Sequence, residues 1–462
     1  MTLIIVTVLL LSYLLIATEN ITKVNKAAVA IFACAVGWVL YICYGTDFVM
    51  SQHEAEYFDF LGDAKPTSVA VKNYIAENVF LKYVGKASEI VLFLLSTMTI
   101  VEILNNNGCF DFITQLLRTR KSQRILWTLS IITFLISANL DNLTTTVMML
   151  MIMRKVIPNR RHRMIFGSAI VVAANCGGML TVIGDPAGLV IWNMNAVTAT
   201  SYSMHLLLPV IVVWLLPTWW LGRSLPERID IEWQTMPYRG DDTNLNVWQR
   251  LIMLFLGIGG LWFIPSFHSI TKLSPFLGAV CVLAVLWVVH EIFNRKLLNA
   301  DQMTLRRMPR VLQYGTQQMI LFVMGIMLAI GVVNETGALN WASSMLDQYV
   351  HNVWVVGIIT GLVSTILDNF ATAMTMFSLY DVNQSAELSN YAQQFAQNGI
   401  YWEIIAFAAA AGGNVLSIGS MSGLALMKAE RVKTGWYFKN VGLMSMLAGV
   451  IGLGLLYAIN MI

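Results

Sequence analysis

Long apolar runs, separated by short polar segments, follow one another along almost the whole chain. Runs of this kind are typical of helices that cross a bilayer. Hydrophobic residues make up 57% of the chain and charged residues 12%, about half the charged share of a soluble domain. Because a water-soluble fold could not bury so much apolar side chain, the sequence predicts an all-α polytopic membrane protein. The predicted runs are 2–18, 27–45, 88–105, 124–136, 143–153, 164–198, 203–222, 248–264, 275–293, 316–334, 352–366, 370–380, 401–427 and 437–459.

Several other classes of protein are excluded. The formal net charge of +3 is too small and too scattered to indicate nucleic-acid binding. The five cysteines lie far apart, so no disulfide framework is indicated. The first run has no basic residue before Lys23, which favours a retained helix with its N-terminus outside over a cleaved signal peptide. The mixed segment 50–87 is interpreted as amphipathic and interfacial.

Basic residues flank a pair of runs, 124–136 and 143–153, that are too short to span. Each arm is about 12 residues, or roughly 18 Å of helix, against a hydrocarbon core of about 30 Å. Lys and Arg favour the cytoplasmic side, so we predict a re-entrant helical hairpin with its tip near residues 137–146. The basic residues are Arg118, Arg120, Lys121, Arg124, Arg154, Lys155, Arg160, Arg161 and Arg163.

A second short pair, 352–366 and 370–380, has the opposite surroundings. The sequence contains no Lys or Arg between Arg310 and Lys428. The same rule therefore predicts a re-entrant hairpin that enters from the outside. Two similar hairpins of opposite orientation indicate an inverted-topology repeat.

Sequence matches between the two halves support this repeat. The pattern Ser137-x-x-x-Asp141-Asn142-x-x-Thr145 aligns with Ser364-x-x-x-Asp368-Asn369-x-x-Thr372. Further along, the stretch from Gly177-Gly178 to Ile183-Gly184 aligns with the stretch from Gly412-Gly413 to Ile418-Gly419.

Each Gly-Gly element lies inside a long apolar run, 164–198 or 401–427. Glycines, together with Pro186 in the first run, are expected to break the helix there. Close helix packing by small residues is the alternative. The duplication, with Asp185 beside the first break, favours two broken helices that line a cavity.

Three aspartates, Asp141, Asp185 and Asp368, are expected near the membrane midplane. The windows 87–117, 125–153, 164–222 and 311–427 contain no Lys or Arg, so we expect these carboxylates to lack a basic partner within the repeats. A buried carboxylate is costly unless it carries a proton or meets a cation. The cluster therefore predicts a site that attracts Na⁺, Li⁺ or H⁺ and repels dicarboxylates and phosphate. A protonated, hydrogen-bonded structural aspartate is the alternative at each position.

Neutral oxygens beside these aspartates are the hard ligands that alkali cations prefer. We expect Na⁺ at Asp141, Asn142, Asp368 and Asn369. For Ser137 and Ser364, which share a helix face with the aspartate four residues on, support of the site and plain helix packing both remain open. The other ion-binding candidates are Thr145, Thr146, Asp185, Thr372, Ser417 and Ser420, and the secondary candidates are Ser137, Thr181, Ser364, Asn414 and Glu102.

The elements SANLDNLTTT, GGMLTVIGDP, ILDNFATA and GGNVLSIGS, in this order, resemble the NhaD-type sodium/proton antiporters of the ion transporter superfamily. That superfamily also contains dicarboxylate symporters and arsenite permeases. The resemblance extends from about residue 85 to 435. It implies a scaffold domain, a transport domain with elevator-like movement, and a homodimer. The chain departs from the family at Pro186-Ala187-Gly188, where threonines are typical, and these three residues supply no side-chain hydroxyl.

The expected function is exchange of Na⁺ or Li⁺ for H⁺ by alternating access, without a cofactor and without enzymatic chemistry. Cation and proton would compete for Asp141 and Asp368, with Asp185 close enough to couple. A sodium-coupled dicarboxylate symporter, an arsenite permease and an ion channel remain alternatives. An intramembrane aspartyl protease is disfavoured, because Gly184-Asp185 and Tyr380-Asp381 echo its motifs only in reversed order.

The predicted organisation follows the repeat. We expect a multi-pass protein of the bacterial inner membrane, with a periplasmic N-terminus and no nucleic-acid partner. The segments are 1–87 (N-terminal helices and interfacial segment), 88–222 (repeat 1), 223–247 (cytoplasmic linker), 248–310 (scaffold helices and cytoplasmic loop) and 311–462 (repeat 2).

Overall fold

The computed structural model describes residues 1–232, 245–294, 310–383 and 390–461, and this part of the chain is almost entirely helical. Eight of its helical segments are long and apolar enough to cross a membrane. The prediction of an all-α polytopic membrane protein is therefore confirmed. These segments are Lys26–Cys43, Ser68–Asn106, Arg160–Leu180, Ala199–Gly222, Val247–Thr271, Pro275–Phe293, Gln317–Glu335 and Thr434–Asn460.

Two helical hairpins occupy the positions of the predicted short pairs. The first consists of α9 (Ser122–Ser137) and α10 (Asn142–Val156), and the second of α20 (Val353–Ser364) and α21 (Asn369–Phe377). Their helices have 9 to 16 residues, which corresponds to about 14 to 24 Å. Each arm is thus shorter than a hydrocarbon core of about 30 Å.

Two helices are interrupted where the Gly-Gly elements predict a break. The first is divided into α11 (Arg160–Leu180) and α12 (Pro186–Asn193). The second is divided into α22 (Ile400–Gly412) and α23 (Met421–Glu430). The half-helices α12 and α23 each begin at a residue whose side chain accepts a hydrogen bond from the helix backbone, Asp185 and Ser420. These N-caps explain why the chain re-enters a helix directly after each break.

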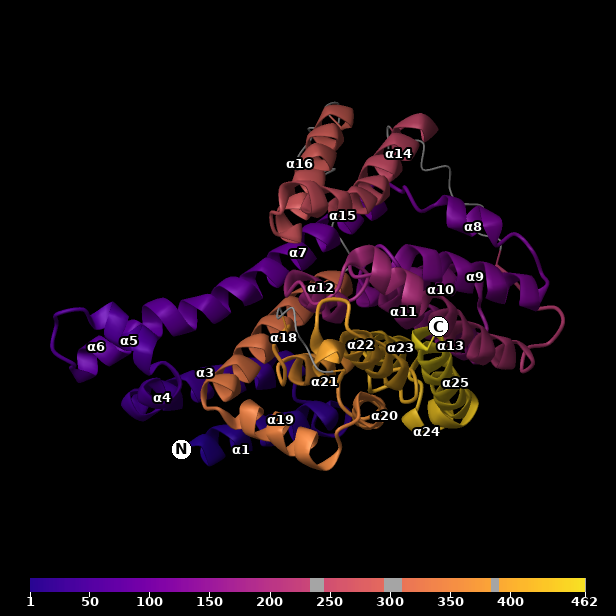
Figure 1. Ribbon diagram of the computed structural model, residues 1–462. Coiled ribbons are helices and arrows are strands. Elements are labelled where there is room, and N and C mark those ends of the chain that lie inside the picture. The colour runs from indigo at the N-terminus through magenta and orange to yellow at the C-terminus, as the bar shows by residue number, and fades with distance from the viewer. Residues whose placement is uncertain (233–244, 295–309, 384–389, 462) are drawn as a thin grey trace.

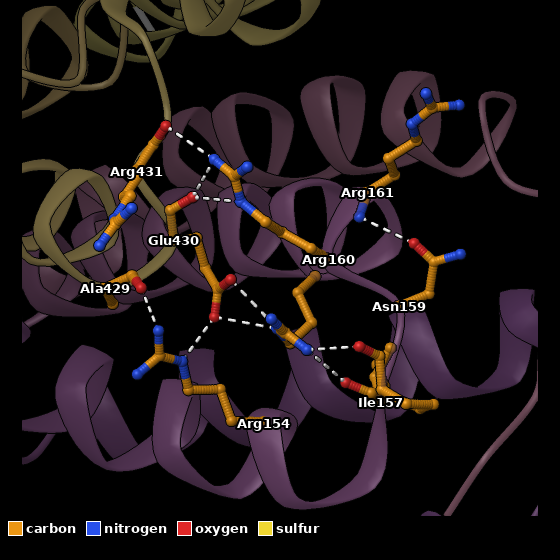
Figure 2. A network of polar contacts seen from close by, with 10 residues as sticks. Arg154, Ile157, Asn159, Arg160, Arg161, Ala429, Glu430 and Arg431 are labelled. Atoms are coloured by element: carbon orange, nitrogen blue, oxygen red, sulfur yellow. Dashed lines mark hydrogen bonds and ion pairs between the residues drawn. The ribbon is translucent and has the colours of Figure 1, made fainter.

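The basic residues at the open end of the first hairpin lie together at one end of the protein. The backbone N–H of Ser122, at the start of α9, donates to the carbonyl of Glu227 at 3.1 Å. The N–H of Glu232 donates to the carbonyl of Val156, the last residue of α10, also at 3.1 Å. At the same end the buried Glu430 closes α23 and meets arginines of α10 and α11 (Figure 2).

The open end of the second hairpin has different neighbours. The Tyr380 hydroxyl, just beyond α21, donates to Asp347 at 2.8 Å. Nearby in the sequence, before α22 begins, the N–H of Asn398 donates to the carbonyl of Ala196 beyond the end of α12 at 2.8 Å. The C-terminal ends of α12 and α23 therefore contact different parts of the chain.

Some of the remaining helices pack around the two hairpins, and others extend away from them (Figure 1). Helix α18 packs on α1, α3 and α7, while α13 packs on α9, α11 and α25. Figure 1 shows α14 and α16 at one edge of the view, beyond α7. The bounds are α1 (Thr2–Ala17), α2 (Glu19–Thr22), α3 (Lys26–Cys43), α4 (Gly45–Gln52), α5 (Glu54–Leu61), α6 (Ser68–Tyr74), α7 (Leu81–Asn106), α8 (Phe112–Leu116), α13 (Ala199–Gly222), α14 (Val247–Leu254), α15 (Gly260–Thr271), α16 (Pro275–Phe293), α18 (Arg310–Glu335), α19 (Ala338–Tyr349), α24 (Thr434–Tyr437) and α25 (Leu443–Asn460).

The segment before residue 88 differs from its prediction. The run predicted to begin at residue 88 is the C-terminal part of a continuous helix that begins at Ser68 and passes through a π-helical turn at Ile75–Phe80. Part of the segment interpreted as interfacial thus belongs to a 39-residue helix. Of the predicted linker 223–247 and loop 248–310, residues 233–244 and 295–309 lie outside the described residues.

A histidine joins the segment between α4 and α5 to the end of α18. His53 contacts Glu335 through Nε2 at 2.6 Å and Glu56 through Nδ1 at 3.1 Å. The hydrogen bond with Glu335 raises the pKa of His53 above its ordinary value, against the opposing effect of burial. Folding therefore stabilises the protonated imidazole relative to its state in the unfolded chain.

This contact predicts a pH-dependent contribution to stability. Because the pKa of His53 is raised on folding, the contribution is complete below the ordinary histidine value of about 6.5 and is lost as pH rises through the folded-state pKa. Substituting His53→Gln should lower the free energy of unfolding by up to about 1 kcal/mol at acid pH and by less at alkaline pH. Thermal unfolding across this pH range measures it. Glu335→Gln should weaken the same pH dependence, because only the contact with Glu56 then remains, and an unchanged profile in both variants would contradict the prediction.

Candidate cation site

The two hairpin tips and the two helix breaks meet at a small buried cavity. Its volume is about 20 Å³, the room of about one water molecule. Its walls include side chains of α18 as well as those of the two hairpins and the two broken helices. The polar residues that line it are Asp141, Asn142, Asn175, Asp185, Asp368, Asn369, Ser420 and Ser422.

Each of the three aspartates is the N-cap of a helix. Asp141 Oδ2 accepts from the N–H of Thr144 at 3.0 Å, at the start of α10. Asp185 Oδ1 accepts from the N–H of Ala187 at 3.1 Å, with Pro186 at the first position of α12. Asp and Pro are common at these two positions because they satisfy or avoid the unpaired N–H groups of the first turn.

The third aspartate has the same role in the second hairpin. Asp368 Oδ1 accepts from the N–H of Phe370 at 3.1 Å, at the start of α21. In the fourth helix, α23, the Ser420 hydroxyl oxygen accepts from the N–H of Gly423 at 3.1 Å. The cavity is thus surrounded by four helix N-termini, and a side chain of the protein caps each one.

Asp185 is the residue that connects the two hairpin tips. Its Oδ2 accepts a hydrogen bond from the amide nitrogen of Asn142 at 3.1 Å and from that of Asn369 at 3.5 Å. The two asparagines therefore direct their N–H₂ groups at Asp185. The amide oxygens are engaged elsewhere, by the Ser137 hydroxyl and by the N–H of Phe370 respectively.

The expectation that the aspartates lack a basic partner is wrong for Asp368. The ammonium group of Lys26, the first residue of α3, contacts Asp368 Oδ2, and Lys26 is 5% exposed. The residue lies outside both repeats, directly before the apolar run 27–45, where a lysine is usually read as a flanking interfacial group. Three carboxylates against one ammonium still leave two negative charges uncompensated when all four groups are ionised.

Three oxygens around the cavity lack a hydrogen-bond partner among the described residues. They belong to the buried side chains Asp141 (Oδ1), Asn175 (Oδ1) and Ser422 (Oγ). A buried polar atom without a partner is uncommon and calls for a ligand, an ion or a water. Within the described part of the chain, no three His, Cys, Asp or Glu side chains converge as a metal-binding group. A cation here would need amide, hydroxyl or carbonyl oxygens as well as a carboxylate.

Several predicted residues support the site without lining it. Ser137 donates to the carbonyl of Ala174 at 2.7 Å and Ser364 donates to that of Ala409 at 2.6 Å, so both tie a hairpin to a broken helix. Asn414 accepts from the Asn175 amide at 2.9 Å. Three other predicted residues donate through their hydroxyls. Thr181 donates to the carbonyl of Ala138, Thr372 to the carbonyl of Asp368, and Ser417 to the sulfur of Met427.

Three further predicted residues also lie outside the cavity lining. Thr145 and Thr146 are buried in α10, and their hydroxyls have no partner among the described residues. Glu102 lies in α7 and is partly buried, away from the residues that line the cavity.

Sequence reasoning missed Asn175, Ser422 and Lys26. Asn175 is two residues before Gly177-Gly178 in an otherwise apolar run, and this position is the signal that could have identified it. Ser422 is two residues after Ser420, which was itself a candidate. No local pattern marks Lys26, because its partner is 342 residues away in the sequence.

A glycine in each break lets the hairpin tip approach closely. A Cβ atom at Gly178 would overlap Oδ1 of Asn142, and one at Gly413 would lie 3.3 Å from Cβ of Asn369. A Cβ at Gly184 or Gly419 would lie 2.7 Å from the carbonyl oxygen of Ser137 or Ser364. An added side chain would thus crowd the hairpin tip at corresponding positions of the two breaks.

Substituting Gly178→Ala should push the Asn142 amide away from Asp185. Since the added methyl group overlaps a side chain that contacts the cavity's central carboxylate, we expect cation affinity to fall by at least about tenfold, equivalent to about 1.4 kcal/mol. Isothermal titration of the solubilised protein with NaCl measures it. Gly454→Ala in α25 is the control, because nothing lies within 4 Å of its added Cβ. Equal affinities of the two variants would contradict the prediction.

Comparisons with known proteins agree with the motifs. The family described as CitMHS, citrate transporter, matches residues 3–412. Sodium/proton antiporter 2 of Arabidopsis thaliana is 30% identical over 362 residues, which cover 77% of this chain and 82% of that protein. Sodium/proton antiporter 1 of the same plant is 31% identical over 364 residues, 77% of this chain but only 59% of that longer protein.

A bacterial relative is similar over much of its length. The Na⁺/H⁺ antiporter NhaD of Vibrio cholerae is 26% identical over 391 residues, 79% of this chain and 76% of that protein. The predicted resemblance to NhaD-type antiporters is therefore confirmed.

Proposed function

The chain belongs to the citrate transporter (CitMHS) family, and from this premise we propose that it exchanges Na⁺ or Li⁺ for H⁺ by alternating access. One observation carries the proposal: three aspartates line a cavity with room for a single small guest, and among the described residues one lysine pairs with them. The names of the relatives, sodium/proton antiporters, point in the same direction.

The size of the cavity argues against citrate as the cargo at this site. Pockets for small organic molecules usually measure about 300–1,000 Å³, whereas this cavity measures about 20 Å³. Its excess negative charge would also repel a carboxylate.

The helix N-termini also favour a cation over an organic anion as the cargo. A helix N-terminus attracts anions, and an organic acid transporter could use it to bind a substrate carboxylate. Here Asp141, Asp185 and Asp368 already occupy three of these positions as N-caps. The protein's own carboxylates thus take the place of a substrate anion, and the remaining demand is for a cation.

Exchange follows from competition for these carboxylates. An ionised carboxylate buried in the membrane is costly, so the cluster binds either protons or a cation. Asp141 Oδ1, Asn175 Oδ1 and Ser422 Oγ offer Na⁺ free oxygens, with Asp185 beside them. Either guest reduces the charge of the site and permits its movement across the membrane, whereas the empty, charged site resists movement.

The proposed architecture is an inverted repeat with a scaffold and a transport domain. The matched contacts of Ser137 and Ser364, and of Asn142 and Asn369, support the duplication. The first hairpin adjoins the basic end, while the second has other neighbours, and this supports opposite orientations. We further propose a homodimer in the bacterial inner membrane, with a periplasmic N-terminus.

Purified protein in liposomes tests the function. A pH-sensitive dye inside the liposomes reports H⁺ movement when Na⁺, Li⁺ or K⁺ is added outside, between neutral and alkaline pH. Exchange predicts H⁺ movement opposite to Na⁺ or Li⁺, which protein-free liposomes do not show. Citrate-dependent Na⁺ uptake without H⁺ counterflow would establish the symporter instead, and arsenite transport would establish the permease.

A further inference from the structure

A groove lies at the basic end of the protein, between α8 and the first turns of α9. Its volume is about 490 Å³, within the range of about 300–1,000 Å³ that is usual for small-molecule sites. Two arginines line it, Arg118 in the segment that joins the two helices and Arg124 in α9. Among the described residues, neither guanidinium group has an ion pair or a hydrogen bond. Both are therefore available to a partner from outside the chain.

The charge in this groove has a single sign. No acidic side chain of the described chain lines it, so the charges of Arg118 and Arg124 are not compensated there. Helix α9 begins beside the groove without a side-chain cap, and the partial positive charge of its N-terminus has the same sign. Planar guanidinium groups match the paired oxygens of a phosphate or a carboxylate. The polar half of the groove therefore suits an anion.

The other half of the groove is apolar and follows α9 into the membrane. Trp127 and Ile131 come after Arg124 along this helix, and Leu116 contributes from α8. Ile131 and Leu116 are 42% and 55% exposed. Arg124 and Ile131 are seven residues apart, or about 10 Å along the helix, whereas the headgroup layer on each side of a bilayer is about 5–8 Å thick. With Arg124 among the headgroups, Ile131 reaches the hydrocarbon.

We propose that this groove binds one anionic phospholipid, with its phosphate at Arg118 and Arg124 and an acyl chain along Trp127 and Ile131. Basic pockets beside membrane helices are typical sites for anionic headgroups, and tryptophan is common at the boundary between headgroups and acyl chains. A soluble anion would pair with the arginines but leave the apolar half of the groove uncovered. The proposal goes beyond the proposed exchange and does not depend on it.

Native mass spectrometry of the delipidated full-length protein measures this binding. Phosphatidylglycerol, which is anionic, and phosphatidylcholine, which is zwitterionic, are titrated separately with the same acyl chains. Wild type should bind phosphatidylglycerol at least about tenfold more tightly than phosphatidylcholine. The double substitution Arg118→Gln and Arg124→Gln should weaken the affinity for phosphatidylglycerol about 25-fold, because each basic side chain near the membrane surface contributes about fivefold.

The matched control removes the same charge from the same segment. Arg120 and Lys121 lie between the two arginines in the sequence but do not line the groove. The double substitution Arg120→Gln and Lys121→Gln should therefore weaken the affinity by less than about threefold, well below the effect expected at the groove. All four side chains are exposed, so each variant should unfold at nearly the wild-type temperature in the absence of lipid.

Three results would overturn the proposal. Equal affinity of the wild type for the two lipids would show that the headgroup charge is not recognised. Equal losses in the two double variants would show that diffuse surface charge, rather than the groove, attracts the lipid. Glycerol phosphate, the headgroup without acyl chains, should bind far more weakly than phosphatidylglycerol, and equal binding would establish a site for a soluble anion instead. Each result is independent of whether the wild type exchanges Na⁺ for H⁺.

Discussion

Replacing Asp185 with asparagine is expected to slow Na⁺-dependent H⁺ exchange at least about 100-fold. Asp185 accepts hydrogen bonds from Asn142 and Asn369, one from each hairpin tip. An amide at this position removes the negative charge that attracts both Na⁺ and H⁺. It also adds an N–H₂ group that faces two others. The site then loses its central acceptor as well as one negative charge.

The fold should tolerate the substitution of Asp185 by asparagine. Asparagine is as good an N-cap as aspartate, so α12 should still begin at its present position. The matched control is Glu102→Gln, the same change of carboxylate to amide in α7, away from the cavity. Dye-reported flux in liposomes should collapse for the first variant and persist for the second. Comparable flux in both variants would refute the assignment of the cavity as the exchange site.

Substituting Glu430→Gln should produce the largest loss of stability. Glu430 is 2% exposed at the end of α23, and its carboxylate accepts from Nε of Arg154 at 2.6 Å and from Nε of Arg163 at 3.1 Å. Its carbonyl accepts from Arg160 (Figure 2). Removing one partner of a buried charge cluster costs about 3–5 kcal/mol. We expect about 3 kcal/mol here, because Arg154 is half exposed and water can solvate it.

The control comes from the same cluster. The guanidinium of Arg161 points away from Glu430 in Figure 2, although the residue lies beside Arg160 in α11. Arg161→Gln should change the free energy of unfolding by less than about 0.5 kcal/mol. Thermal unfolding of the solubilised variants compares them. A Glu430→Gln variant as stable as Arg161→Gln would show that the arginines do not depend on this carboxylate.

Much of the fold could be predicted because bilayer constraints are simple. A run of apolar residues forms a helix there, and a run too short to span forms a hairpin arm, as in α20 and α21. Duplicated Asp-Asn pairs mark the two tips because aspartate caps the returning helix. The cavity's polar residues could therefore be identified largely from local patterns.

The remainder depended on contacts that no local pattern specifies. The direction of the Lys26 side chain is set by the packing of α3 on α18, and its partner is 342 residues away. The central position of Asp185 between the two asparagines also depends on how the tips meet. In the segment before residue 88, charged residues such as Lys72, Glu77 and Lys82 conceal a helix that continues without interruption.

The uninterrupted helix from Ser68 to Asn106 has a geometric consequence. Its 39 residues measure about 58 Å, roughly twice the hydrocarbon thickness. Confining it to the bilayer would require a tilt of about 60°, beyond the 0–40° range of membrane helices. Even at a tilt of 40° the helix would rise about 44 Å, so its first turns, which carry Lys72, Glu77 and Lys82, reach beyond the hydrocarbon core at least as far as the headgroup layer. A protease added to only one face of sealed vesicles should cut near α5 from that face alone. This end of the helix is therefore a marker of how the protein is inserted in the membrane.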